Sequence, residues 1–153
     1  MEARLTVITL GVRDVAASRK FYVEGLQWPT FFDVVDEVVF IRIGYGHLML
    51  ALYGADDLAA EAGRIGHAAD GLAPPISLAH NVDSADQVAR VLEQATVAGA
   101  TLIAPAQQRE WGGVSGYFAD PDGFRWEVAH NPFWTIGDDG IIRRAAEADS
   151  PPE

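Results

Sequence analysis

Short apolar runs rich in β-branched and aromatic residues recur along the chain between polar, glycine-containing turns, and they predict β-strands. In the first half these runs lie at 5–10, 31–35, 38–43 and 48–53. After the first run, Asp14 is placed to cap a helix that ends at Gly25. The predicted order of this half is therefore β-α-β-β-β.

The second half repeats this order. Strands are predicted at 76–82, 101–103, 114–118 and 124–129. A helix capped by Asp83 or Ser84 and ended by Gly99 separates the first two of them. The helix openings also match in sequence, since Val12-Arg13-Asp14-Val15-Ala16 is similar to Val82-Asp83-Ser84-Ala85-Asp86 about 70 residues later.

We therefore expect an α+β fold in a single domain, 1–153, whose two repeated modules curl their sheets into one cup. The expected parts are a first module at 4–54, an alanine- and glycine-rich linker at 55–75, a second module at 76–131 and a C-terminal extension at 132–153. The extension has apolar side chains that should pack on a neighbouring module or on a second subunit: Phe133, Trp134, Ile141 and Ile142.

Asp120-Pro121-Asp122-Gly123 is a tight-turn sequence that joins the last two strands into a hairpin. Because side chains alternate along a strand, Arg125, Glu127 and Ala129 share one face. Trp126 lies on the opposite face and is expected in the core.

This hairpin, with a glutamate four residues after the glycine of the turn, resembles the closing signature of the vicinal oxygen chelate superfamily. The superfamily includes glyoxalase I, the bleomycin- and fosfomycin-resistance proteins and extradiol dioxygenases. The similarity spans most of residues 4–131. It implies an eight-stranded, cupped, mixed sheet with helices on its outer face, and in many members a homodimer.

In metal-using members of this superfamily, four cup-facing positions supply the ligands. Matched by motif, these positions are Val7, Leu50, Ser77 and Glu127, of which only Glu127 is a strong donor. The resemblance therefore implies a branch that lacks most of the metal ligands, and we expect neither a metal nor another cofactor.

The four histidines are poor replacements for the missing ligands. His80 and His130 have the wrong strand parity to share a face with Ser77 and Glu127. His47 is beside a predicted turn and His67 is in the expected linker.

The same motif match predicts the lining of the cup, with Glu127 as the candidate catalytic residue. The expected ligand-binding residues around it are Thr9, Leu50, Ser77, Trp111, Ser115 and Tyr117. In the fosfomycin-resistance branch, the counterparts of Thr9, Ser115 and Tyr117 lie near the substrate.

Glu127 and Trp111 each have a second interpretation. Glu127 could act as a general base or acid, or could accept hydrogen bonds from hydroxyls or pair with Arg42 or Arg125. The indole of Trp111, in a glycine-flanked turn, could stack on a planar ligand or pack on the linker or a dimer partner.

The composition limits the chemistry and the binding partners that this chain can have. The chain has no cysteine, so disulfides, thiolate metal sites and a cysteine nucleophile are excluded. With 22 acidic and 11 basic residues the net charge is -11, which disfavours nucleic acids and anionic membranes. No apolar run is long enough to span a bilayer, and we expect a cytoplasmic protein.

These features favour a protein that binds a small organic molecule in a metal-free cup, for sequestration or for acid–base chemistry at Glu127. The alternative is a metal-dependent lyase, isomerase or dioxygenase that uses Glu127 with ligands not yet placed. A third possibility is a structural or protein-interaction domain, whose cup would be filled by its own side chains.

Overall fold

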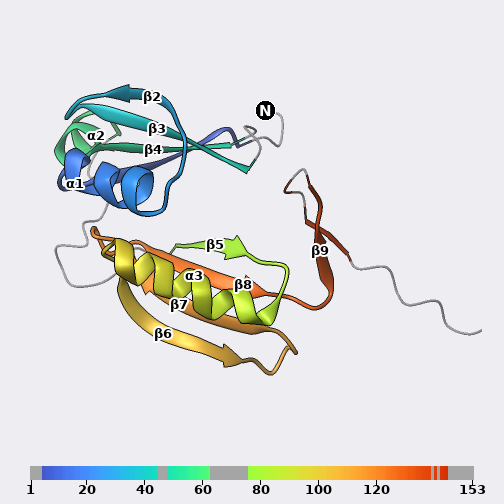
Figure 1. The fold of residues 1–153 in the computed structure, drawn as a ribbon. Coiled ribbons are helices and arrows are strands. Elements are labelled where there is room, and N and C mark those ends of the chain that lie inside the picture. Colours follow the sequence, from blue (N-terminus) through green and yellow to red (C-terminus); the bar gives the residue numbers. More distant parts are fainter. Residues whose placement is uncertain (1–4, 45–47, 63–75, 139, 141, 145–153) are drawn as a thin grey trace, which may run out of the picture.

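A computed structural model describes residues 5–44, 48–62, 76–138, 140 and 142–144. The first half contains β1 (Val7–Val12), α1 (Val15–Arg19), the π-helix η1 (Lys20–Gly25), β2 (Thr30–Val34), β3 (Val38–Ile43), β4 (Leu48–Gly54) and α2 (Ala55–Ala62). The second contains β5 (Ser77–Asn81), α3 (Ala85–Ala98), β6 (Thr101–Gln108), β7 (Val114–Ala119) and β8 (Arg125–His130), followed by β9 (Trp134–Ile136) and β10 (Ile142–Arg144). The predicted α+β class and its two β-α-β-β-β repeats are confirmed (Figure 1).

The strands of the two modules have the same connectivity. Their orders are β1-β4-β3-β2 and β5-β8-β7-β6, in two four-stranded sheets. In each sheet the first strand runs parallel to the last and the other pairings are antiparallel. The eight expected strands thus form two mixed sheets of four within the described chain.

Both main helices begin as the sequence predicts. The Asp14 side chain accepts a 2.9 Å hydrogen bond from the backbone N–H of Ala17. At α3, Ser84 rather than Asp83 is the N-cap, and Gly99 ends the helix with φ +115°. These caps satisfy backbone groups that a helix end leaves unpaired. None of the helices in the described ranges is long and apolar enough to cross a membrane.

The two modules share one hydrophobic core, which includes Trp126 as predicted. The ring of Phe21 in η1 lies 6.3 Å from that of Phe118, and the ring of Tyr22 lies 6.1 Å from that of Trp126, between centroids. η1 also contacts α3. The helical layers therefore lie against each other, and each sheet turns its helix-free face away from the shared core.

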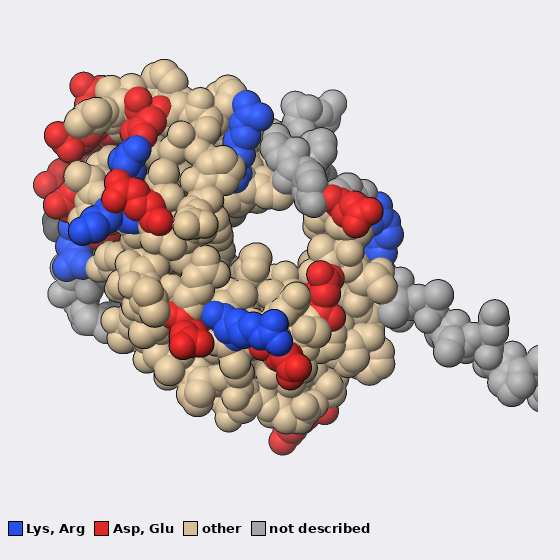
Figure 2. Space-filling view, in the orientation of Figure 1, with Lys and Arg blue, Asp and Glu red and all other residues tan. Residues whose placement is uncertain are grey.

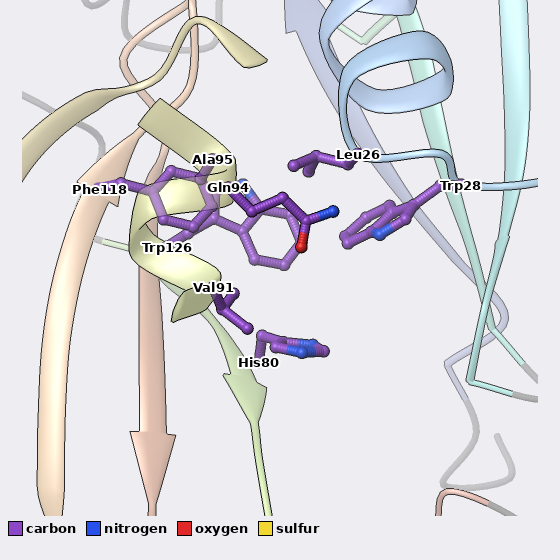
Figure 3. Close-up of a pocket in the computed structure, with 8 residues that line it drawn as sticks. All are labelled: Leu26, Trp28, His80, Val91, Gln94, Ala95, Phe118 and Trp126. Atoms are coloured by element: carbon purple, nitrogen blue, oxygen red, sulfur yellow. The ribbon is translucent and has the colours of Figure 1, made fainter. Parts of the chain in front are cut away.

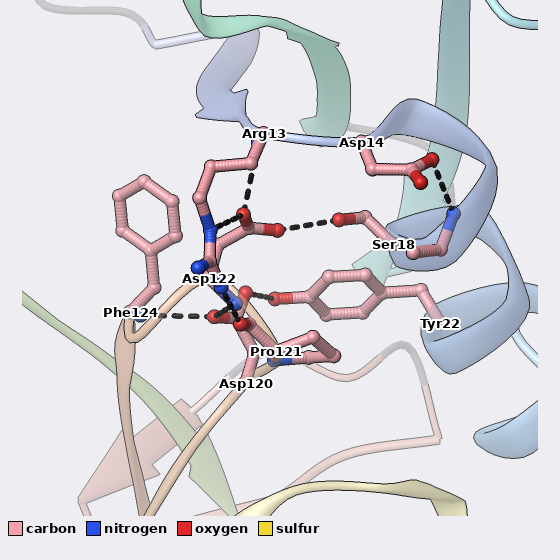
Figure 4. Close-up of polar contacts among 9 residues, drawn as sticks. Arg13, Asp14, Ser18, Tyr22, Asp120, Pro121, Asp122 and Phe124 are labelled. Carbon is pink, nitrogen blue, oxygen red and sulfur yellow. Dashed lines mark hydrogen bonds and ion pairs between the residues drawn. The ribbon is translucent and has the colours of Figure 1, made fainter.

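The Asp120–Gly123 turn of the second module binds the first helix of the first module (Figure 4). Asp122 Oδ1 accepts hydrogen bonds from the backbone N–H and the Nε of Arg13, at 2.9 and 3.2 Å. Asp122 Oδ2 accepts from the Ser18 hydroxyl at 2.5 Å. We call Arg13, Ser18, Tyr22, Asp120 and Asp122 the module clasp.

Tyr22 is the buried centre of the module clasp. Its hydroxyl donates to Asp120 Oδ2 at 2.5 Å and accepts from the indole N–H of Trp126 at 3.0 Å. Burial, followed by the charge of Asp120, raises the pKa of Tyr22 well above its ordinary value. Burial also raises the pKa of Asp120, against the opposing effect of the Tyr22 hydrogen bond.

The strands β9 and β10 form a small hairpin that extends away from the two modules (Figure 1). Phe133, Trp134 and Ile142 are 63, 42 and 42% exposed. The Phe133 ring lies near the turn of the second module, since a Cβ added at Gly112 would be 3.8 Å from it. Ile141 lies outside the described residues. Figure 2 shows an opening in the molecule between this hairpin and the modules. Packing of these side chains against a second subunit stays a prediction.

Tyr22→Phe should lower the free energy of unfolding by about 1 to 3 kcal/mol, because it leaves a buried carboxylate oxygen and a buried indole N–H without their partner. Urea denaturation followed by tryptophan fluorescence measures this change. The control is Tyr53→Phe, which removes an exposed hydroxyl bonded to Glu61 and should have little effect. Equal losses in both variants would contradict the role of the module clasp.

Candidate functional site

The helix-free face of the second sheet brings three predicted site residues together. Tyr117 pairs directly with Glu127 across β7 and β8, and Ser115 lies two residues before Tyr117 on the same face. The Tyr117 hydroxyl donates a hydrogen bond to Glu127 Oε1 at 2.7 Å. Glu127 is half-buried. The expectation that Glu127 accepts from a neighbouring hydroxyl is met by Tyr117.

Small side chains surround this pair. Ala79 pairs with Glu127 on the side away from Tyr117, and Ala104 pairs with Tyr117. Within this row, the outer neighbours of the pair are therefore alanines. Burial raises the pKa of Tyr117, with the Glu127 hydrogen bond and charge adding to the effect and Arg109 opposing it. The phenol therefore remains protonated at neutral pH and donates to the carboxylate.

Arg109, which the sequence did not single out, lies over the same face. Its Nε donates to the Ser115 hydroxyl at 2.9 Å and its Nη2 to the Ser115 carbonyl at 3.2 Å. When the side-chain amide of Gln107 is oriented with its oxygen towards Arg109, that oxygen accepts a hydrogen bond from Arg109 Nη1 at 2.7 Å. The reach of a long side chain from a turn back onto a strand cannot be deduced from local sequence.

Thr9 lies on the helix-free face of the first sheet and is exposed. It shares a row across that sheet with Ala51, Phe40 and Phe32. This row corresponds to Ala79, Glu127, Tyr117 and Ala104 in the second sheet. Strand pairing does not join Thr9 to Glu127 within the described chain, because the two residues belong to different sheets.

Leu50 requires a correction. It pairs with Ile8 and Ile41, is 0% exposed and belongs to the core. Since strand neighbours alternate between faces, Ala51 rather than Leu50 stands in the place that Glu127 has in the second sheet. Leu50 therefore does not line the predicted cup.

Ser77 is exposed and shares a face with Glu127, but its partner across the strands is Arg125. Ala79 takes the position opposite Glu127. Ser77 is thus one row removed from the hydrogen-bonded pair. Arg125 donates to the Gly123 carbonyl at 3.4 Å and makes no ion pair with Glu127.

The first sheet presents aromatic residues on its helix-free face. The rings of Phe32 and Phe40 lie 6.3 Å apart. The guanidinium of Arg42 lies 4.7 Å from the ring centroid of Phe31, a cation–π contact. Phe31 and Phe32 are 56 and 52% exposed, so this apolar face is open to solvent in the single chain.

The indole of Trp111 folds onto the backbone of its own turn. A Cβ added at Gly113 would lie 1.7 Å from an atom of that ring, so residue 113 has to be glycine for this packing. Trp111 is nevertheless 44% exposed. Its outer surface remains available to a ligand or a second subunit.

The residues around Glu127 do not fit a metal centre. Within the described residues, no group of three or more His, Asp or Glu side chains could hold a metal ion. His130 Nδ1 lies 3.3 Å from the Val82 carbonyl oxygen. His47 and His67 lie outside the described residues, so their predicted positions remain untested.

His80 lines a different cavity, on the helix side of the second sheet (Figure 3). This cavity has a volume of about 70 Å³ and lies between the modules. Trp28 and Trp126 form part of its walls and Gln94 extends into it. Burial lowers the pKa of His80, which favours the neutral imidazole.

A protein-family model described as the Glyoxalase/Bleomycin resistance protein/Dioxygenase superfamily matches residues 4–128. The chain belongs to this superfamily. The resemblance based on the β7–β8 hairpin is thereby confirmed. No protein of curated function matches the chain.

Solved structures of glyoxalase-superfamily proteins support the assignment. A glyoxalase-related enzyme from Fulvimarina pelagi is 37% identical, with a TM-score of 0.83 over 95% of this chain and 100% of that one. A superfamily enzyme from Burkholderia phytofirmans PsJN is 16% identical, with a TM-score of 0.68 over 84 and 98% of the two chains. A lactoylglutathione lyase from Agrobacterium tumefaciens is 20% identical, with a TM-score of 0.64 over 88 and 98%. The last two show likeness of fold alone.

Glu127→Gln should lower the pKa of Tyr117, because it removes the negative charge and weakens the hydrogen bond, both of which raise this pKa. The measurement is an NMR titration of the ¹³C-labelled tyrosine ring carbons. Glu61→Gln is the matched control, since Glu61 raises the pKa of Tyr53 in the same way. It should lower the pKa of Tyr53 and leave that of Tyr117 unchanged. If Tyr117 does not respond to Glu127→Gln, the pair does not form in solution.

Proposed function

We propose that this protein binds a small organic molecule over the helix-free face of the second sheet, and that Glu127 exchanges a proton with it without a metal ion. The observation that carries the proposal is the 2.7 Å hydrogen bond between Tyr117 and Glu127, in a row whose outer residues are the alanines Ala79 and Ala104. A few convergent polar groups beside open space are typical of small-molecule sites.

Tyr117 and Glu127 together suit the abstraction of a proton from a carbon next to a carbonyl group. Glu127 Oε1 already accepts from Tyr117, so Oε2 is the oxygen that takes a proton from a bound carbon acid. The protonated phenol of Tyr117 is a hydrogen-bond donor that can stabilise negative charge as it develops. The description of the 37% identical Fulvimarina pelagi protein as a glyoxalase-related enzyme supports a catalytic role over sequestration alone.

The aromatic face of the first sheet supports a homodimer. Phe31 and Phe32 are costly to leave in water, and both are exposed in the single chain. If the aromatic face of one subunit covers the Glu127 face of its partner, both surfaces are buried and a ligand is enclosed between them. Two copies related by a two-fold axis form two such sites.

Proton exchange provides a test that does not require the natural substrate. In D₂O, the protein should accelerate hydrogen–deuterium exchange next to the carbonyl of at least one compound in a panel of small ketones, aldehydes and 2-oxo acids, as followed by ¹H NMR. Glu127→Gln should abolish this exchange and leave affinity within about tenfold, or ~1.4 kcal/mol, because the amide keeps the shape of the side chain.

The matched control is Glu110→Gln, which removes the same charge from an exposed position in the β6–β7 turn. It should exchange at the wild-type rate. If exchange is found and survives Glu127→Gln, Glu127 is not the base. If no compound exchanges faster than in buffer, the catalytic part of the proposal is wrong.

The dimer is tested by sedimentation velocity. Wild-type protein at tens of micromolar should sediment as a dimer, whereas Phe32→Glu should sediment as a monomer because it places a charge in the buried aromatic face. Val97→Glu is the control, since Val97 is 84% exposed on α3, away from that face. A monomeric wild type would contradict the shared site.

A further inference from the structure

We infer that the ligand of this face is a small organic carboxylate and that Arg109 binds its carboxylate group. The inference rests on the proposed function, because it names the class of molecule that the Glu127 face receives. It adds a specificity-determining residue that neither the sequence motifs nor the superfamily assignment supplies.

The first argument is charge. The chain has a net charge of -11, and two of its guanidinium groups, both in the first module, are bound by acidic partners. Arg13 pairs with Asp122, and Arg19 pairs with Asp33 and Glu24. Arg109, by contrast, is bonded only to neutral groups of Ser115 and Gln107 in the described structure. A half-buried cation held by neutral partners is suited to an anion from outside the chain.

The second argument is rigidity. The contacts to the Ser115 hydroxyl, the Ser115 carbonyl and Gln107 fix the guanidinium over β7. Ser115 itself is 1% exposed. A guanidinium has more N–H groups than these partners use, so at least one donor remains for a ligand. Because the side chain is already ordered, little further conformational entropy is lost when an anion binds.

The third argument is spacing. Ser115 and Tyr117 are two residues apart on one strand face, a separation of about 7 Å. A carboxylate that accepts from Arg109 near Ser115 therefore places carbons two or three bonds away beside Glu127. This separation suits short acids in which the acidic C–H lies close to the carboxylate. The anion is bound at one end of the site, and the proton is removed at the other.

The test compares shape-matched pairs of probes that differ in charge, such as phenylacetate with phenylacetamide and pyruvate with pyruvamide. Binding to the full-length protein is measured by ¹H–¹⁵N NMR titration, with shifts required near Glu127. The carboxylate should bind at least about tenfold more tightly than its amide, and Arg109→Gln should remove this preference. Amide affinity should change little, because an uncharged amide gains no charge-assisted hydrogen bond from the guanidinium.

Arg125→Gln is the matched control, because Arg125 lies on the same face and its replacement changes the net charge equally. If it reduces the preference as much as Arg109→Gln does, the effect is general attraction and the inference is wrong. If amides bind near Glu127 as tightly as carboxylates, the inference fails while the proposed site stands. If no probe of either kind binds there, the proposed site fails as well.

The same data distinguish ligand binding by Arg109 from a purely structural role in the β6–β7 hairpin. In the structural case, Arg109→Gln would lower stability without changing the preference for carboxylates over amides. Should Arg109→Gln not fold, Arg109→Lys decides the matter. Lysine keeps the charge but loses the planar pair of N–H donors. Carboxylate affinity should then fall several-fold more than amide affinity, and equal changes would overturn the inference.

Discussion

Two carboxylates in a single turn determine how the halves of this molecule meet. Asp122 binds the start of the first helix, and Asp120 binds Tyr22 within the core. One turn of the second module is thus bonded to the first module both at the surface and in the interior. The helical layers are thereby pressed together and the helix-free faces are directed outward. The candidate site depends on this orientation, because Glu127 and the aromatic residues of the first sheet lie on outward faces and do not face each other.

Much of the fold could be predicted because the residues that begin and end its helices and strands act locally. Asp14 and Gly99 fix helix ends through their own conformations, and β3 has the bounds that its apolar run indicates. The packing of the modules could not be predicted in this way. The sequence shows that Asp120 and Asp122 form a turn, but their partners Tyr22 and Ser18 are about a hundred residues away and nothing local specifies them.

The face on which a site residue lies could be predicted where buried and more exposed side chains alternate along a strand. It could not be predicted where the strand is continuously buried. Along β8, buried Trp126 and Val128 mark one face, so Glu127 could be assigned to the other. In β4, Leu50, Ala51 and Leu52 are all buried, and a continuous apolar run carries no parity signal. The motif match therefore assigned Leu50 one residue away from the true position, Ala51. Arg109 escaped prediction because its position depends on a side chain that folds back across a turn.

The equivalent rows of the two sheets are filled by different kinds of side chain. Thr9, Ala51, Phe40 and Phe32 lie on the helix-free face of the first sheet, in the places that Ala79, Glu127, Tyr117 and Ala104 have in the second. One repeat thus carries an ionisable pair at its centre where the other carries an alanine beside an aromatic ring. Tyr22 of the first repeat and Trp126 of the second are bonded within the shared core, so separating the repeats would expose the interior of both.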